Sequence, residues 1–214
     1  MPVRPSPIYV VEAVLALEGK QKALKTELAK LVPLCRKEKG AISYELFQDL
    51  VNPSLFRAVM RWNCEEDYKA HTSSPHIQGF AQKFEGVLYD EKQIVEDAYR
   101  HFIPGQPLPA KHQNASPGEA ILCISYFRVK PQHRDELIRA LLTLVALTQK
   151  EPGCIYYELY VDATNANLIV LTSKFIHYQA FDDHEKEPYI ARFVEGPMTQ
   201  YCEEITWNES KEVV

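Results

Sequence analysis

The sequence KEKGAISYEL, residues 37–46, occurs a second time in altered form as KEPGCIYYEL, residues 150–159. The two copies are 113 residues apart, and the same offset holds well outside them. It extends without a gap from Ile8, which aligns with Ile121, as far as Phe80. A long ungapped match of a sequence to itself is typical of a duplicated structural unit. The chain is therefore predicted to contain two copies of one domain.

The boundaries of these domains follow from a change in composition between them. The segment FIPGQPLPAKHQNASPGEA, residues 102–120, is dense in proline and glycine and has no apolar periodicity. Such a composition is typical of an extended linker. We place the first domain at 1–98, the linker at 99–119 and the second domain at 120–214. Because each unit alone has a marginal core, we expect the two to pack together as an intrachain pseudo-dimer. A homodimer of the whole chain is a further alternative.

Composition and charge exclude several classes of partner. The chain has 214 residues, of which 46% are apolar and 25% charged, as in an ordinary globular protein. A net charge of −5 argues against a nucleic-acid or anionic membrane partner. No apolar run approaches the ~18 residues of a membrane span, and the N-terminus lacks the apolar core of a signal peptide. The five cysteines show no CxxC spacing and are expected as free thiols. These features predict a cytoplasmic protein.

Hydrophobic periodicity predicts the same order of elements in both units. The first unit is expected to contain, in chain order, a strand, a helix, two strands, a helix and a strand: Ile8–Leu17, Lys20–Lys39, Ala41–Asp49, Leu55–Trp62, Glu65–Phe84 and Gly86–Ala98. The second unit repeats them: Ile121–Val129, Gln132–Glu151, Cys154–Asp162, Leu168–Phe175, His177–Phe193 and Thr199–Trp207. The order β-α-β-β-α-β is that of the ferredoxin-like fold, with both helices on one face of an antiparallel sheet. The fold class is therefore α+β.

The first strand is apolar on both of its faces. Val10 and Val14 alternate with Val11, Ala13 and Leu15. Since the helices cover one face only, the other face is expected to meet a second apolar surface. The sheet of the sister unit is the obvious candidate, which would give a two-sheet barrel of the dimeric α/β type within one chain. Sheets shared between chains are the alternative.

At this level the sequence resembles the antibiotic biosynthesis monooxygenase domains. The resemblance rests on Lys37–Leu46, on Arg61 and Trp62 at the end of the hairpin, and on the helix segment AHTSSPH, residues 70–76. It covers almost the whole of both units, and it implies ferredoxin-like units of the α/β-barrel type. The same scaffold serves quinol and anthrone monooxygenases, haem-degrading enzymes and members without a settled activity.

The oxygenase branch of this family implies a reaction without metal or flavin. A hydroxylated aromatic loses a proton in an apolar pocket, and the resulting anion is electron-rich enough to reduce O2 directly. We therefore expect a monooxygenase that needs no cofactor and acts on a small quinol-like or anthrone-like aromatic with O2. The alternative is a non-catalytic protein that binds an aromatic ligand or serves in a stress-response assembly.

Such a reaction needs a base, and two residues are candidates for it. His71 and its counterpart His184 are the histidines kept between the repeats, and imidazole suits a base near neutral pH. Glu12 interrupts an apolar strand, as a pocket carboxylate or an edge residue would, and the second repeat has Ser125 there. We predict His71 and Glu12 as catalytic residues. The alternative for His71 is a packing or capping role.

Residues that could hold the substrate gather around the same elements. Tyr44 and Tyr157 recur within the quoted stretch, and Trp62 closes the hairpin, where the second repeat has Phe175. The predicted substrate-binding residues are Trp62, Tyr44, His76, Phe80, His184 and Tyr157. For Trp62 core packing is the alternative, for the tyrosines a hydrogen bond to a backbone group, and for His76 a surface or packing role. Because Trp62, His71 and His76 occur together only in the first unit, that unit is expected to hold the better site.

Metal and haem chemistry are not predicted. His71 and His76 are five residues apart, but a metal site needs a third ligand, and the second repeat has Tyr189 in place of His76. The haem-degrading branch uses an Asn-Trp-His trio. The residues that align with this trio are Glu12, His71 and Ala81 in the first unit and Ser125, His184 and Val194 in the second. Since none of the six matches, haem degradation is disfavoured.

Overall fold

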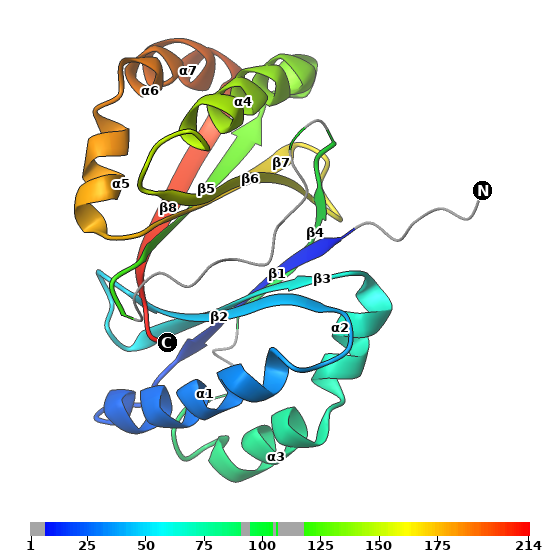
Figure 1. The fold of residues 1–214 in the computed structure, drawn as a ribbon. Coiled ribbons are helices and arrows are strands. Elements are labelled where there is room, and N and C mark those ends of the chain that lie inside the picture. The colour runs from blue at the N-terminus through cyan, green and yellow to red at the C-terminus, as the bar shows by residue number, and fades with distance from the viewer. Residues whose placement is uncertain (1–6, 91–94, 105, 107–117) are drawn as a thin grey trace. The chain divides into compact units, whose positions relative to one another are not determined.

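The computed structural model describes residues 7–90, 95–104, 106 and 118–214, with the backbone alone for 95–99. The chain forms two compact units. Unit 1 comprises Met1–Tyr99 together with Lys211–Val214, and unit 2 comprises Arg100–Ser210. Both are ferredoxin-like α+β units, as predicted (Figure 1). Among the described residues, no helix is long and apolar enough to cross a membrane. All five cysteines are free thiols.

Unit 1 has an antiparallel sheet with helices on one face (Figure 1). Its elements are β1 (Ile8–Leu15), α1 (Gln21–Cys35), β2 (Ala41–Asp49), β3 (Leu55–Trp62), α2 (Glu65–Thr72), α3 (Pro75–Phe84) and the first part of β4 (Val95–Phe102). Strand β3 lies between β1 and β2. The backbone N–H of Val213 donates to the carbonyl of Leu46 at 2.8 Å, so the C-terminal residues continue this sheet beside β2.

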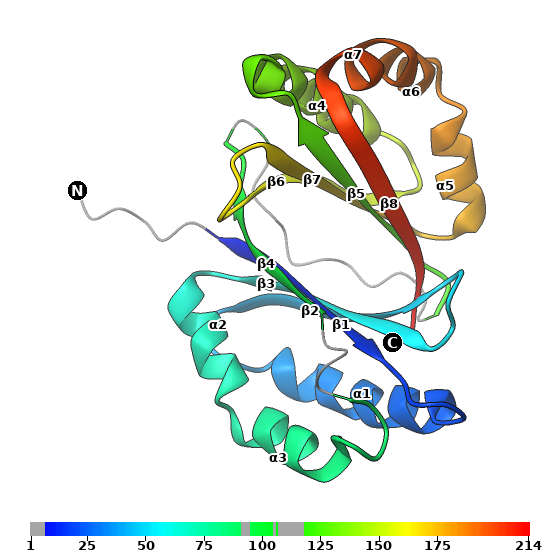
Figure 2. The same cartoon turned by 180° about the vertical axis from the view of Figure 1, so that it is seen from behind.

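Unit 2 repeats the arrangement, again with its helices on one face of the sheet (Figure 2). Its elements are β5 (Ile121–Val129), α4 (Arg134–Thr148), β6 (Cys154–Asp162), β7 (Leu168–Phe175), α5 (Tyr178–Glu185), α6 (Pro188–Phe193), α7 (Thr199–Tyr201) and β8 (Cys202–Glu212). Strand β7 lies between β5 and β6. Arg100–Phe102, the end of β4, pairs with β6 and so belongs to this sheet.

Most predicted elements are confirmed, and the differences have physical causes. Both predicted second helices divide before a proline, at Pro75 and at Pro188, because the residue before proline disfavours helical geometry. By contrast, α1 continues through Pro33 to Cys35. The fourth strand was predicted at 86–98 but spans Val95–Phe102, and residues 91–94 lie outside the described part of the chain.

The first helix of each unit buries the same set of positions against the sheet. In α1 these are Leu24, Leu28, Leu31, Val32 and Cys35. In α4 they are Leu137, Leu141, Leu144, Val145 and Thr148, each 113 residues further on. The spacing of three and four residues places all five on one helix face. It also places the buried residues Cys35 and Thr148 at the C-terminal ends of their helices, just before residues 37–46 and 150–159.

The opposite face of the unit 1 sheet differs from the apolar surface expected of β1. Val11 is buried there as predicted and Tyr9 is buried too, but charged residues from β2 and β3 are buried beside them. Arg61 Nη1 lies 3.3 Å from Glu45 Oε2 and joins the two strands. The alternation of β1 could not reveal these charges, because they come from its neighbours.

Asp49 fixes the turn of the unit 1 hairpin. Its Oδ1 accepts hydrogen bonds from the backbone N–H groups of Val51 and Asn52 at 2.9 and 2.7 Å. Its Oδ2 accepts one from Arg57 Nη1 at 2.5 Å. Burial by itself raises the pKa of the Asp49 carboxyl, but the hydrogen bonds from Asn52 and Arg57 lower this pKa below its ordinary value. The ionised carboxylate therefore stabilises the folded hairpin.

Substitution Asp49→Asn is expected to lower the free energy of unfolding at pH 7 by about 1–3 kcal/mol, because the bond to the Arg57 guanidinium loses its charge. Since the folded-state pKa is the lower one, this contribution is present above the unfolded-state pKa and is lost as pH falls through the folded-state value. The difference between wild type and variant should thus narrow below about pH 4. Urea unfolding of both proteins at a series of pH values measures this difference in the free energy of unfolding.

The matched control is Asp162→Asn in unit 2. Asp162 makes the same turn bonds, to the backbone N–H groups of Thr164 and Asn165, but Val170 stands where unit 1 has Arg57. A gap between wild type and Asp49→Asn that stays constant down to pH 3 contradicts the assignment.

Candidate functional site

A glutamate just after the first helix contacts a histidine in the second helix of each unit. In unit 1, His71 Nδ1 lies 3.1 and 3.0 Å from the two carboxylate oxygens of Glu38. In unit 2, His184 Nδ1 lies 2.9 and 3.2 Å from those of Glu151. Both histidines are buried. Because a carboxylate only accepts, Nδ1 donates, and the neutral ring then carries its lone pair on Nε2.

The glycine of the quoted stretch makes this contact possible. Gly40 has φ +81°, a conformation that favours glycine, and a Cβ there would collide with the Asp67 side chain in α2. A Cβ on Gly153 would collide with Ala180 in α5. The absence of a side chain thus allows the turn before β2 or β6 to approach the second helix closely. Glu38, two residues before Gly40, is thereby brought to the histidine.

Two of the predicted residues, Trp62 and Tyr44, lie around His71. Its ring centroid lies 4.8 Å from that of Trp62 and 5.6 Å from that of Tyr44. Trp62 is fully buried, and its Nε1–H has no hydrogen-bond partner among the residues that the structure describes. In unit 2, His184 has Phe175 and Tyr157 at 4.9 and 5.3 Å. The histidine therefore lies in an aromatic environment in both repeats.

Of the other predicted residues of unit 1, Glu12 is linked to the surroundings of His71 through Tyr68, whose ring centroid lies 6.0 Å from that of His71, whereas Phe80 packs elsewhere. Glu12 is half-buried in β1, and its Oε1 accepts a hydrogen bond from the Tyr68 hydroxyl at 2.8 Å. Phe80 stacks on Tyr89, with 5.7 Å between ring centroids, and also packs beside Phe84. Glu12 is thus bridged to the second helix, and Phe80 is part of the packing around α3.

The buried hydroxyl and thiol groups are held in their neutral forms. Burial raises the pKa of the Tyr44 and Tyr157 phenols well above their ordinary value. Burial, together with the nearby Glu38 carboxylate, raises the pKa of the Cys35 thiol to about 12. Near neutral pH these groups are therefore hydrogen-bond donors rather than anions.

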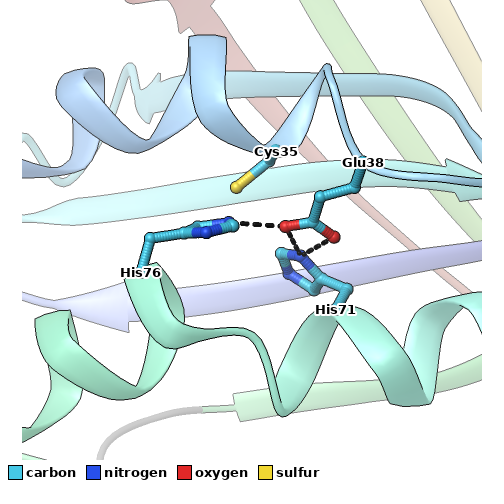
Figure 3. A group of neighbouring side chains, drawn as sticks. All are labelled: Cys35, Glu38, His71 and His76. Atoms are coloured by element: carbon cyan, nitrogen blue, oxygen red, sulfur yellow. Dashed lines mark hydrogen bonds and ion pairs between the residues drawn. The ribbon is translucent and has the colours of Figure 1, made fainter.

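A third residue approaches the glutamate in each unit, and its type differs. In unit 1, His76 Nε2 lies 2.5 Å from Glu38 Oε1 (Figure 3). In unit 2, Tyr189 occupies this position, and its hydroxyl donates to Glu151 Oε1. Burial and this hydrogen bond raise the pKa of Tyr189. The glutamate therefore accepts from two side chains in both repeats.

Sequence reasoning missed Glu38, Glu151 and Cys35. The two glutamates are 113 residues apart, as are the two histidines, so a search for polar residues shared between the repeats would have paired them. Cys35 carried no such signal, because Thr148 replaces it in the second repeat. The expectation of no metal site rested on the lack of a third ligand. Cys35 and Glu38 bring two further donor atoms beside His71 and His76 (Figure 3).

An apolar pocket of about 490 Å³ lies in unit 2 beside His184. Apolar side chains form most of its wall, among them Phe127, Phe181, Phe193, Leu144, Leu171, Ile190 and Ile205. The polar groups that line it include Ser125, Ser173, Tyr157 and His184. Within the described residues, the Tyr157 hydroxyl has no hydrogen-bond partner. His184 also lines a second cavity of about 280 Å³ together with Glu151.

Two small residues on the sheet help to form this pocket. Ser125 and Ser173 line it, whereas the same positions of unit 1 carry Glu12 and Met60. Met60 is fully buried in the unit 1 core, and Glu12 is bound to Tyr68. Both serines are smaller than the residues that unit 1 carries at the same positions. The better site was expected in unit 1, whereas this pocket lies in unit 2.

Known proteins that are similar to this chain support the ferredoxin-like fold described above. Residues 7–83 and 120–196 each match the family model described as antibiotic biosynthesis monooxygenase. A solved structure named "Putative monooxygenase" from Fusobacterium nucleatum has a TM-score of 0.87, with 14% identity over 99% of this chain and 94% of that one. An anthrone oxidase-like protein has a TM-score of 0.65, with 15% identity over 98% of this chain and 92% of that one. At these identities the likeness concerns the fold.

A curated relative is also similar in sequence. An uncharacterised protein of Synechocystis is 32% identical over 77 residues, which are 36% of this chain and 52% of that protein. The chain thus spans about half the length of this relative.

Removal of the glutamate should be costly. Substitution Glu151→Ala leaves the buried His184 and the Tyr189 hydroxyl without their acceptor, and we expect the free energy of unfolding to fall by about 1–3 kcal/mol. Glu38→Ala should act similarly in unit 1. Urea unfolding measures both. The control Glu203→Ala removes an exposed carboxylate and should stay within about 0.5 kcal/mol of wild type. Equal effects of Glu151→Ala and Glu203→Ala would show that the contact contributes nothing.

Proposed function

Because the chain belongs to the antibiotic biosynthesis monooxygenase family, we propose that it is a monooxygenase whose unit 2 pocket binds a small hydroxylated aromatic substrate. Family membership supports the general monooxygenase role. The observation that carries the proposed site is the apolar pocket of about 490 Å³ with His184 in its wall. Among the described residues that line the pocket, His184 alone is a buried side chain with one ring nitrogen hydrogen-bonded to a carboxylate, that of Glu151.

The pocket suits a planar aromatic of the quinol or anthrone type. Its volume lies within the roughly 300–1,000 Å³ of small-molecule sites. The rings of Phe127, Phe181 and Phe193 offer apolar contact to an aromatic substrate. Trp207 and Val194, the strongly exposed apolar residues of the lining, are 63% and 39% exposed. They mark the side on which the pocket opens.

His184 is the proposed general base. Glu151 holds its Nδ1–H, so Nε2 carries the lone pair that accepts the proton of a substrate hydroxyl or of an activated carbon. The same carboxylate stabilises the imidazolium that forms, as an acidic partner does for the histidine of a catalytic triad. A positioned base of this kind contributes about 10²–10⁴-fold in rate.

The remaining polar groups of the pocket can hold the substrate oxygens. Tyr157 is a neutral phenol with a raised pKa, and its hydroxyl can donate to the oxygen on which negative charge develops. Ser125 and Ser173 offer two further hydroxyls from the sheet. The deprotonated aromatic reduces O2 and combines with it. One oxygen atom then enters the product, the other leaves as water, and the substrate supplies all the electrons.

Oxygen uptake with a panel of quinols and anthrones in chelator-treated buffer tests this proposal. Substrate-dependent uptake is expected, and His184→Ala should lower kcat/KM by about 10²-fold or more. The control His101→Ala removes an exposed histidine of β4 and should retain activity. Activity that depends on His71 and not on His184 would place the reaction in unit 1, as the sequence predicted.

Substitution Ser173→Met tests the pocket separately. It introduces the side chain that unit 1 carries at this position, so the fold is known to accommodate it in the sister unit. We expect the substrate KM to rise at least about 10-fold, because the added volume fills the pocket. Fluorescence titration with a naphthol measures binding without turnover. Tight binding without any oxygen uptake would identify a binding protein instead.

A further inference from the structure

We propose that Cys35, Glu38, His71 and His76 of unit 1 form a binding site for a zinc-like divalent cation. Cys35 ends α1 and Glu38 follows it, while His71 and His76 come from α2 and α3. One potential ligand atom from each of the four residues lies within 4.8 Å of every other. Figure 3 shows the four side chains directed at one another. The site goes beyond the proposed oxygenase function and lies in the other unit.

The donor set selects the class of metal. A thiolate, a carboxylate and two imidazoles are the ligand types that Zn²⁺ binds in tetrahedral sites. Mg²⁺ and Ca²⁺ prefer sets made of oxygen alone, so thiol and imidazole donors argue against them. Metal–ligand bonds of about 2.0–2.3 Å place neighbouring donors roughly 3.3–3.6 Å apart. The spacing observed here, from 2.5 Å between His76 and Glu38 to at most 4.8 Å, brackets this value.

The present hydrogen bonds show how an ion would be accommodated. Glu38 bridges the two histidines, and the ring nitrogens that face it are Nδ1 of His71 and Nε2 of His76. An ion placed among these atoms would replace the two bridging contacts with coordination bonds. Each imidazole would then bind the ion through the nitrogen that faces Glu38 and carry its proton on the other ring nitrogen. Binding also forms a metal–sulfur bond to Cys35 and releases the thiol proton to solvent.

Burial gives the site a closed side and an accessible side. Cys35 is fully buried, and the His71 side chain is 1% exposed. The side chains of Glu38 and His76 are 15% and 23% exposed, so an ion can reach the group past them. Once bound, it would join the end of α1 to α2 and α3. Such a link stabilises the folded unit, because the metal binds the folded state and not the unfolded chain.

Unit 2 provides the natural comparison. The same four positions carry Thr148, Glu151, His184 and Tyr189. The Thr148 hydroxyl lies 3.3 Å from that of Tyr189, which donates to Glu151. Two neutral hydroxyls thus stand where unit 1 has thiol and imidazole, and both are poor zinc ligands. The scaffold therefore tolerates either set, and only the unit 1 set has four metal-ligating groups.

Zinc content after dialysis, measured on the tag-free full chain, tests the site. Wild type is expected to retain one equivalent of Zn²⁺. The double variant Cys35→Thr with His76→Tyr, which gives unit 1 the residues of unit 2, should retain none. Co²⁺ added in place of Zn²⁺ should give d–d bands typical of tetrahedral coordination and a thiolate charge-transfer band. Zn²⁺ should raise the Tm of wild type and leave that of the double variant unchanged.

The reciprocal variant Thr148→Cys with Tyr189→His keeps the test decisive if the first variant does not fold. It should bind a second equivalent of Zn²⁺. Three results overturn the proposal: no zinc retained by wild type, equal retention by the Cys35→Thr/His76→Tyr variant, or a cobalt complex without the thiolate band. None of these measurements depends on oxygen uptake, so their outcome is independent of the oxygenase proposal.

Discussion

The contact between a glutamate and a buried histidine organises both units of this protein. Glu38 with His71, and Glu151 with His184, join the turn after the first helix to the second helix. The glycine that follows each glutamate permits the close approach, and the carboxylate fixes which ring nitrogen carries the proton. His76 in unit 1 and Tyr189 in unit 2 also contact this carboxylate. The quoted stretch is therefore part of the site as well as a marker of the fold.

Around this common contact the two repeats have diverged in different directions. Small residues on the unit 2 sheet, Ser125 and Ser173, leave room for a pocket beside His184. Unit 1 has larger groups there and instead surrounds its glutamate with Cys35 and a second histidine. Duplication allows this, because one copy can keep a function while the other changes. The proposals for the two units, an oxygenase pocket and a cation site, follow from these differences.

Sequence alone predicted the two ferredoxin-like units and most strand boundaries. These features depend on alternating apolar residues and on prolines within each short segment. Sequence reasoning misplaced β4, whose end pairs with β6, and also β8, which spans Cys202–Glu212 where 199–207 was predicted. Residues Thr199–Tyr201 of that predicted strand form α7. It singled out His71, His184 and Tyr157 through their recurrence at a fixed offset, but it gave Glu38 and Glu151 no role. It expected an apolar pocket only through the family resemblance and favoured unit 1 for it, because the volume of a pocket depends on side chains from several elements. Cys35 was missed because a lone cysteine at a buried helix position is indistinguishable from packing.

By these proposals, the same kind of Glu–His contact serves an aromatic ligand in unit 2 and a cation in unit 1. The imidazole ¹H–¹³C spectrum of the seven histidines, assigned with single substitutions, tests it most directly. We expect a naphthol to shift the His184 signals and leave His71 and His76 in place. Zn²⁺ should shift His71 and His76 and leave His184 in place. If both probes move the same histidine, or if naphthol moves His71 alone, the account is contradicted.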